Sequence, residues 1–205
     1  MKITITDIMY INDAARILKQ RNIMWIQDKI FGIDNFNYII YMPLDASKLS
    51  VFPSRGLIIN QRDLSKFVKS ISMESEFEFD ENTTSSSIVT ISEVLMIQTS
   101  LQTESIILKN IKSINDINTS ICNIPEEDIS SKLEQLYGMS KTSGAIQYKY
   151  DDSHIMTLFS GVIPLTKSDK LFIKIWDNSE TTFLTCFRVQ KKQINVFVYL
   201  LYLKI

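Results

Sequence analysis

The residue types that most often carry catalysis or hold metals are sparse in this chain of 205 residues. Its single histidine, His154, follows the two carboxylates Asp151 and Asp152. No second histidine and no nearby cysteine can complete a zinc ligand set around it. No GxSxG motif is present either, so the pattern favours solvated carboxylates at a turn over a Ser-His-Asp site. We predict no metal site and no catalytic residue.

Cysteine and glycine usage also argues against an enzyme. Cys122 and Cys186 lie far apart without CxxC spacing, which favours free thiols in a cytosolic protein over a disulfide. The phosphate-cradling motifs GxGxxG and GxxxxGK[ST] are missing from a chain that has five glycines. We therefore predict a non-enzymatic protein without a cofactor.

Basic side chains give a stronger indication of function, because they recur at helical spacing. In the segment 61–71 the cations are separated by four and three residues, opposite the apolar Leu64 and Phe67. Such a face is either simply solvated or a surface that follows nucleic-acid phosphates, with an affinity that falls steeply with salt. The candidate contacts on two predicted helices are Arg16, Lys19, Arg21, Arg62, Lys66 and Lys69. Lys109 and Lys112 repeat the three-residue spacing further along the chain.

Aromatic residues such as Trp25, Phe172, Trp176, Tyr199 and Tyr202 fall mostly at alternating positions of predicted strands. A base-stacking platform would need aromatic rings on one exposed face with basic neighbours. We interpret these rings as core residues.

The bulk composition is that of a globular protein, with 45% hydrophobic and 22% charged residues and a net charge of -1. The first residues alternate with polar ones and do not resemble a signal peptide. No window reaches the roughly 18 to 20 apolar residues that a spanning helix needs, and the apolar run Ile194–Leu203 is too short. We expect a cytoplasmic protein without a membrane partner.

Hydrophobic periodicity predicts strands interrupted by short helices in the first half. The chain should open with a strand over 1–8 and a helix over 11–22 that is capped by Asn12 or Asp13. Two strands over 23–34 and 36–45 should follow, with a turn near Gly32 to Asn35. The remaining elements are a strand through Ile59, a helix to Ile71, a hairpin over 76–93 with its loop at 80–87, and a strand from Val94.

The second half follows a polar crossover, Gln102 to Asn123, within which Ile106 to Ile114 could supply a helix. A helix is expected from Pro125 to Gly138, with the acidic residues Glu126, Glu127 and Asp128 in its first turn. Strands are expected over 145–152 and 154–161, followed by a meander over 170–177, 181–189 and 194–203. We predict an α+β protein with two domains of antiparallel strands, 1–102 and 124–205, short helices on one face, and 103–123 as the segment between them.

This order of elements resembles that of the DNA sliding clamps, the processivity factors of the proliferating-cell-nuclear-antigen type and their T4-like phage relatives. The resemblance lies in "MKITITDIMYINDAARILKQ", in "LIINQRDLSKFVKSI" followed by "SEFEFDENT", and in "KLFIKIWDNSETTFLTCFRVQKKQINVFVYLLYLKI". It implies a head-to-tail homotrimeric ring, with helices lining a hole that encloses duplex DNA without sequence readout. The six basic residues named above would be the lining contacts. Polymerase and clamp-loader peptides would dock in an apolar pocket between the domains.

Two features depart from that family. The second half shows one convincing helix after the crossover, and this helix is acidic, whereas a uniform lining would be basic. Two other interpretations therefore stay open: a viral structural or assembly protein with a self-associating β-rich fold, and a clamp-fold factor in viral transcription.

Overall fold

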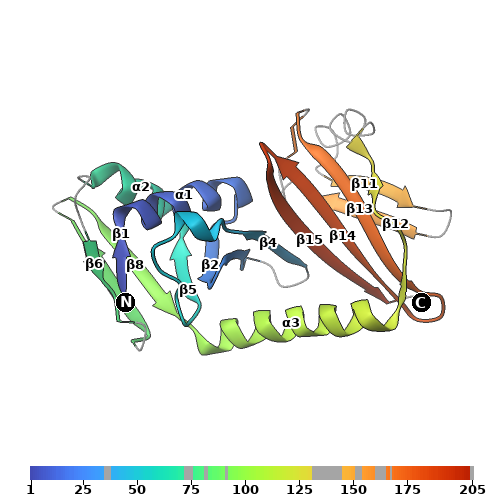
Figure 1. The fold of residues 1–205 in the computed structure, drawn as a ribbon, viewed down its shortest axis with the longest axis horizontal. Helices are drawn as coiled ribbons and strands as arrows, with labels where there is room; N and C mark the ends of the chain where they lie inside the picture. Colours follow the sequence, from blue (N-terminus) through green and yellow to red (C-terminus); the bar gives the residue numbers. More distant parts are fainter. Residues whose placement is uncertain are drawn as a thin grey trace. The chain divides into compact units, whose positions relative to one another are not determined.

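The computed structural model describes residues 1–34, 38–71, 76–80, 83–90, 92–130, 145–150, 154–159, 165–166 and 168–203. The chain divides into two compact units, residues 1–117 and 118–205, and each is considered by itself (Figure 1). Antiparallel strands are combined with helices, so the predicted α+β class is confirmed.

The first unit contains a sheet in which every neighbouring pair of strands is antiparallel. Its strands, in spatial order, are β4 (Ile39–Pro43), β3 (Lys29–Gly32), β2 (Asn22–Ile26), β5 (Leu57–Asn60), β8 (Val94–Thr99) and β7 (Ser85–Val89). A separate pair joins β1 (Lys2–Thr4) to β6 (Glu76–Glu78), and a 3-10 turn, η1 (Ala46–Lys48), precedes β5.

Two strand predictions in this unit are wrong. The single strand expected over 23–34 is two strands, because the chain turns at Gln27, which has a positive φ of 50°. The Trp25 Nε1–H donates to the Gln27 carbonyl oxygen at 2.9 Å and braces this turn. The hairpin expected over 76–93 does not form, since β6 pairs with β1 and β7 pairs with β8. Local alternation predicts a strand but not its partner.

Helix α1 (Ile5–Leu18) begins well before the predicted caps Asn12 and Asp13. Its N-cap is Thr4, which forms a capping box with Asp7: the Asp7 N–H donates to Thr4 Oγ1 at 3.2 Å, and the Thr4 N–H donates to Asp7 Oδ2 at 2.9 Å. The Ile and Thr alternation of this segment is typical of a strand, but the capping box and burial of the helix against the sheet outweigh that preference.

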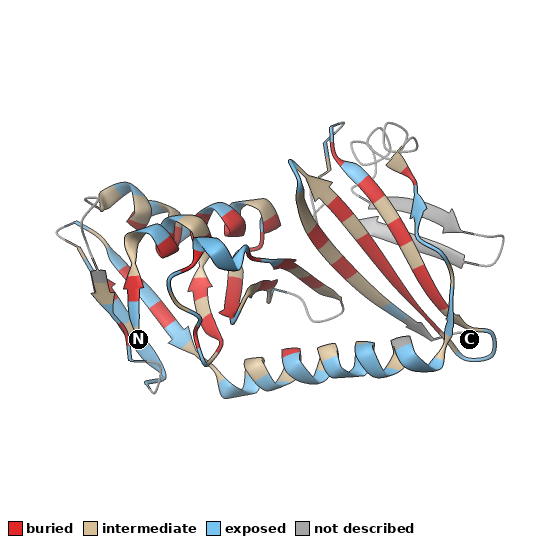
Figure 2. Cartoon of the chain, in the orientation of Figure 1, coloured by how far each residue is buried: buried red, intermediate tan, exposed pale blue. Residues whose placement is uncertain are grey.

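Helix α2 (Gln61–Ser70) confirms the predicted second helix. The Asn60 side chain caps it by accepting hydrogen bonds from the N–H groups of Arg62 and Asp63. Leu64 and Phe67 are buried, as the period of the segment predicts. Helices α1 and α2 pack together on the sheet of the first unit, and the buried residues lie between these layers (Figures 1 and 2).

The polar crossover is a 20-residue helix, α3 (Leu101–Ser120), and its part up to Ile117 belongs to the first unit. Ser100 starts it, with its carbonyl accepting from Glu104 N and its hydroxyl accepting from Thr103 N. The sequence predicts only part of this helix, because its many Asn, Ser and Thr residues have low helix propensity. No helix in the described part of the chain combines the length and apolarity that crossing a membrane requires.

The second unit confirms the predicted meander of β13 (Lys170–Asn178), β14 (Thr182–Lys191) and β15 (Ile194–Leu203). Two short strands, β9 (Cys122–Asn123) and β10 (Glu127–Asp128), pair with β13. The predicted strands over 145–152 and 154–161 form a separate hairpin, β11 (Ala145–Tyr150) and β12 (His154–Phe159). Buried residues alternate along β13, which is the pattern of a sheet with one face in the core (Figure 2).

The predicted acidic helix does not begin at Pro125. Glu127 and Asp128 are in strand β10, and the Ile129 N–H donates to the Leu171 carbonyl at 2.9 Å. The Glu126 carboxylate instead accepts hydrogen bonds from Arg188 of β14, and the Asp128 carboxylate accepts them from the N–H and hydroxyl groups of Ser130. The rest of that prediction, residues 131–144, lies outside the described residues.

Candidate nucleic-acid interface

Four of the six predicted basic residues surround one hollow of about 480 Å³ in the first unit. The hollow lies where the end of α1, the start of β2 and the start of α2 meet. We call it the cationic hollow, and its lining residues are Arg16, Lys19, Gln20, Arg21, Gln61 and Arg62. Tertiary structure thus joins two basic segments that are separated by some forty residues of sequence.

The backbone around the cationic hollow is held by hydrogen bonds. Lys19 ends α1 in the left-handed conformation, and its N–H donates to the Ala15 carbonyl. Across the hollow, the Gln61 N–H donates to the Arg21 carbonyl at 2.9 Å and ties the start of α2 to the start of β2. The N–H groups of Arg21 and Asn22 both donate to the Asp34 carboxylate. The two basic walls are therefore fixed relative to one another.

Gly32 allows Gln20, one of the residues that line the hollow, to pack closely against the backbone of β3. A Cβ atom at Gly32 would lie 2.5 Å from Cγ of Gln20 and 2.7 Å from Cγ2 of Ile40. Gln20 is buried, so its side chain has little room to move aside. The glycine is required here by this close approach rather than by an unusual backbone angle.

The charge of the hollow is positive and open to solvent. Arg16, Lys19, Arg21 and Arg62 are all exposed, and in the described part of the chain none of their side chains forms an ion pair. The first turn of α2 adds the partial positive charge of a helix N-terminus. Asp34 offsets part of this charge, although backbone groups bind its carboxylate. The arrangement suits an anion with spaced negative charges, such as a phosphate backbone.

The other two predicted contacts are not in the hollow. Lys66 and Lys69 lie further along α2, and both are exposed. Lys66 is 4.0 Å from Asp63 across one helical turn. We missed Gln20 and Gln61 in the sequence because neutral amides carry no charge periodicity, although Gln61 directly follows the Asn60 cap.

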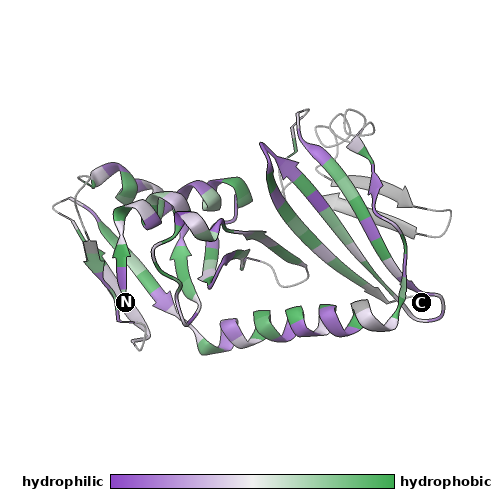
Figure 3. Ribbon diagram, viewed as in Figure 1, coloured by the Kyte–Doolittle hydropathy of each residue, from purple (hydrophilic) through white to green (hydrophobic). Residues whose placement is uncertain are grey.

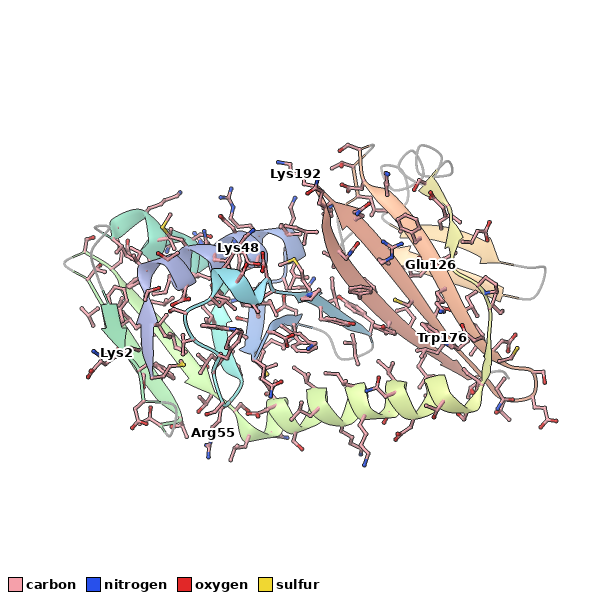
Figure 4. The ribbon with its side chains drawn as sticks, in the orientation of Figure 1. Lys2, Lys48, Arg55, Glu126, Trp176 and Lys192 are labelled. Atoms are coloured by element: carbon pink, nitrogen blue, oxygen red, sulfur yellow. The ribbon has the colours of Figure 1, made fainter. Side chains whose placement is uncertain are left out.

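Two cations of the second unit, Arg188 and Lys191, form ion pairs. Arg188 forms a fork on Glu126, with Nε to Oε1 at 2.9 Å and Nη2 to Oε2 at 2.7 Å, and it lies 3.8 Å from the Phe172 ring centroid. The hydrogen bonds from Arg188 lower the pKa of Glu126, and those to Glu126 raise the pKa of Arg188. Figure 4 labels Glu126 and Trp176 among the side chains of the second unit. Lys191 Nζ lies 3.0 Å from the buried Asp169 carboxylate.

Groups with catalytic potential remain apart. No cluster of metal-ligating side chains occurs among the residues that the structure describes. His154 is in β12, while Asp151 and Asp152 are outside the described residues. Both cysteines are free, and burial raises the pKa of the Cys186 thiol to about 12, which keeps it protonated at neutral pH.

Comparisons with known proteins show distant structural likeness only. No protein-family model matches the chain, and no curated protein matches it. Among solved structures, a match with 12% identity and a TM-score of 0.37 covers the whole chain and 97% of the other protein, in a structure described as the C-terminal region of FEN-1 bound to A. fulgidus PCNA.

Two further matches come from Pseudomonas aeruginosa. The DNA polymerase sliding clamp with ligand has 11% identity and a TM-score of 0.42, over 98% of this chain. The DNA polymerase III subunit beta has 8% identity and a TM-score of 0.41, over all of it. The chain spans 64% of each of these two proteins. Sliding clamps are also the class that the element order resembles.

Proposed function

We propose that this protein is a DNA sliding clamp, a ring-forming and non-enzymatic processivity factor that encircles duplex DNA and tethers a polymerase. The observation that carries the proposal is the cationic hollow, where the end of α1, the segment before β2 and the start of α2 bring exposed cations together. Exposed Arg and Lys side chains can contact phosphates without reading bases. Such contacts are exchanged easily and weaken with salt, so they allow movement along DNA.

Retention on DNA would come from closure of the ring rather than from tight contacts. We infer a homotrimer whose subunits meet at sheet edges. Strand β7 supports self-association, because among the described residues it pairs only with β8 and leaves its other edge open. Val89 on this strand and its cross-strand neighbour Val94 are exposed, as is Met96. An open edge with apolar neighbours favours strand pairing with another chain.

The proposed partners are duplex DNA, bound through its backbone, and peptides of a polymerase and a clamp loader. The proposed setting is the cytoplasm, which would be that of the host cell if the source is a virus.

Retention on circular DNA tests encirclement directly. A closed ring loaded onto nicked circular DNA should stay bound through a wash at high salt, and should leave once the DNA is made linear. Light scattering should give the mass of a closed trimer. Equal loss from circular and linear DNA, or a monomer at all concentrations, would exclude the clamp.

A viral structural or assembly protein is the second candidate, and strand β7 favours it, because within the described part of the chain its outer edge has no partner strand. Its self-association would produce open polymers that grow with concentration, whereas a ring stops growing at a fixed mass. A clamp-fold factor in transcription would form the ring but bind transcription proteins instead of a polymerase of replication.

A further inference from the structure

The outer face of helix α3 carries apolar and basic side chains. These side chains are not part of the cationic hollow, where we propose that DNA binds. This α3 outer face consists of Leu101, Ser105, Leu108, Lys109 and Lys112, which together with Glu104 line a second hollow of about 450 Å³. All of these residues belong to the first unit. Figure 3 shows hydrophobic and hydrophilic residues mixed along α3, and Figure 2 shows that most of the helix is exposed.

The opposite side of α3 already anchors the helix to its own unit. Ile107 is buried against Met24, Ile26 and Phe31, with Ile111 packed beside them. The Glu104 carboxylate accepts a hydrogen bond from the Gly56 N–H at 3.1 Å. The helix therefore does not need the α3 outer face for its attachment to this unit.

Two leucines on this face remain in water. Leu101 is 66% exposed and Leu108 is 47% exposed, and their spacing of seven residues places them on one side of the helix, two turns apart. An exposed leucine alone is ordinary, but two that border one hollow form a surface that gains free energy when it is covered. The spacing matches the anchor positions with which amphipathic helices bind each other.

The charge of the α3 outer face determines what could cover it. Lys109 and Lys112 are exposed, and within the described part of the chain neither ammonium group forms an ion pair. Glu104, the one acidic side chain among the described lining residues, accepts a hydrogen bond from a backbone N–H group. A partner with apolar anchors flanked by carboxylates would complement both features. A nucleic acid would satisfy the lysines but leave the leucines without a matching surface.

We propose that the α3 outer face docks an acidic amphipathic segment of a partner protein, with its apolar side chains against Leu101 and Leu108 and its carboxylates at Lys109 and Lys112. This extends the proposed function, because a tether has to hold a partner protein as well as DNA. Docking here is separate from the cationic hollow, so the two sites can be disabled independently.

The test uses the full chain and a displayed library of random peptides of about 16 residues, which is more than four helical turns. Binders are counter-selected against the variant Leu101→Ser/Leu108→Ser. We expect peptides with apolar residues at helical spacing and an excess of Asp and Glu. Their affinity, measured by fluorescence anisotropy, should fall at least about tenfold in that variant and in Lys109→Glu/Lys112→Glu. A peptide in which Lys replaces the acidic residues should show the reverse preference.

Matched controls come from similar residues elsewhere. Leu201→Ser changes a leucine that is 51% exposed, and Lys66→Glu/Lys69→Glu changes two exposed lysines on α2. Neither should alter peptide binding, and all variants should keep the wild-type melting temperature. Retention on circular DNA is measured with the same α3 variants and should persist.

Several results would overturn the inference. The library could yield no binders that depend on the α3 outer face, or binders without acidic enrichment. The variant Lys109→Glu/Lys112→Glu could lose affinity for duplex DNA instead of affinity for peptides. The leucine variant could lose self-association, which would make a second copy of this chain the occupant. Loss of circular-DNA retention by hollow variants with peptide binding intact would support it, because the two sites would then be independent. Absence of retention in the wild type with peptide binding intact would refute the clamp and leave the docking surface standing.

Discussion

Two groups of cations, one in each unit of this chain, are arranged in opposite ways. In the first unit, Arg16 and Arg62 face solvent across the cationic hollow without an ion-pair partner among the described residues. In the second unit, Arg188 forms a two-pronged bond to Glu126, and Lys191 pairs with the buried Asp169. The residue types are the same, but only the first arrangement leaves positive charge available to a ligand.

This difference has an energetic cause. A cation that stays in water retains its hydration and can exchange it for phosphate contacts with release of counterions. A cation that is partly buried loses hydration, and a fixed carboxylate must compensate for that loss. Arg188 and Lys191 therefore depend on their carboxylate partners, whereas the cations of the hollow stay hydrated and are suited to binding.

Neutralising the hollow should give the largest effect. In the variant Arg16→Gln/Lys19→Gln/Arg21→Gln/Arg62→Gln, affinity for duplex DNA should fall by orders of magnitude at low salt. If all four cations contact phosphates, the slope of log affinity against log salt should become less steep by about 3.6. Fluorescence anisotropy over a series of salt concentrations measures both quantities.

Two matched variants sharpen this result. Lys66→Gln/Lys69→Gln should lose less affinity, because these lysines lie outside the hollow and Lys66 has Asp63 nearby. Arg188→Gln should bind DNA as the wild type does. If the slope of log affinity against log salt did not change in the hollow variant, the exposed cations of the first unit would not be the phosphate contacts.

Asp7 should give the next largest effect, and this effect is on stability. Its side chain is 1% exposed and accepts hydrogen bonds from the N–H and hydroxyl groups of Thr4 and Ser50. Burial alone would raise the pKa of Asp7, but these hydrogen bonds outweigh it and lower the pKa below its usual 3.8. In Asp7→Asn, some of the N–H and hydroxyl donors of Thr4 and Ser50 would face the amide NH2 group instead of a carboxylate oxygen. The free energy of unfolding should therefore fall by about 2–3 kcal/mol at pH 7.

The pH dependence of this contribution has a definite sign. Because the folded pKa is lowered, the stabilisation is fully present above the unfolded pKa near 4 and is lost as pH falls through the folded pKa. Urea unfolding from pH 7 down to about pH 3 should show this loss in the wild type and a weaker one in Asp7→Asn. Trp25 and Trp176 report on separate units in single-tryptophan variants, and the Trp25 transition should shift more. An equal shift at both would contradict a local effect.

Arg188→Lys should give the smallest of the three effects. Lysine keeps the charge but loses the fork on Glu126 and the planar contact over Phe172. Both partners are partly exposed, so we expect a loss of about 1 kcal/mol in the free energy of unfolding, seen mainly in the Trp176 transition. DNA affinity should not change, and a parallel loss of DNA binding would show that the second unit contributes phosphate contacts.

Part of the fold and of the site was predictable from local pattern. The meander over β13, β14 and β15 follows from alternation interrupted by short polar turns. Helix α2 follows from the period of Leu64 and Phe67 after the Asn60 cap. Helix α1 was predicted too late in the chain and α3 only in part, because β-branched and polar residues carry weak or contrary helix preferences that packing overrides.

By itself the sequence determined which residues carry charge, their spacing on α2, the alternation of the strands and the scarcity of catalytic residue types. Only the tertiary structure decided that Arg62 joins Arg16, Lys19 and Arg21 around one hollow, that Lys66 and Lys69 lie outside it, and that Glu126 binds Arg188 instead of starting a helix. Periodicity describes neighbours within one element, whereas these groupings depend on which elements pack together. That choice is set by long-range burial and strand pairing, which local spacing does not record.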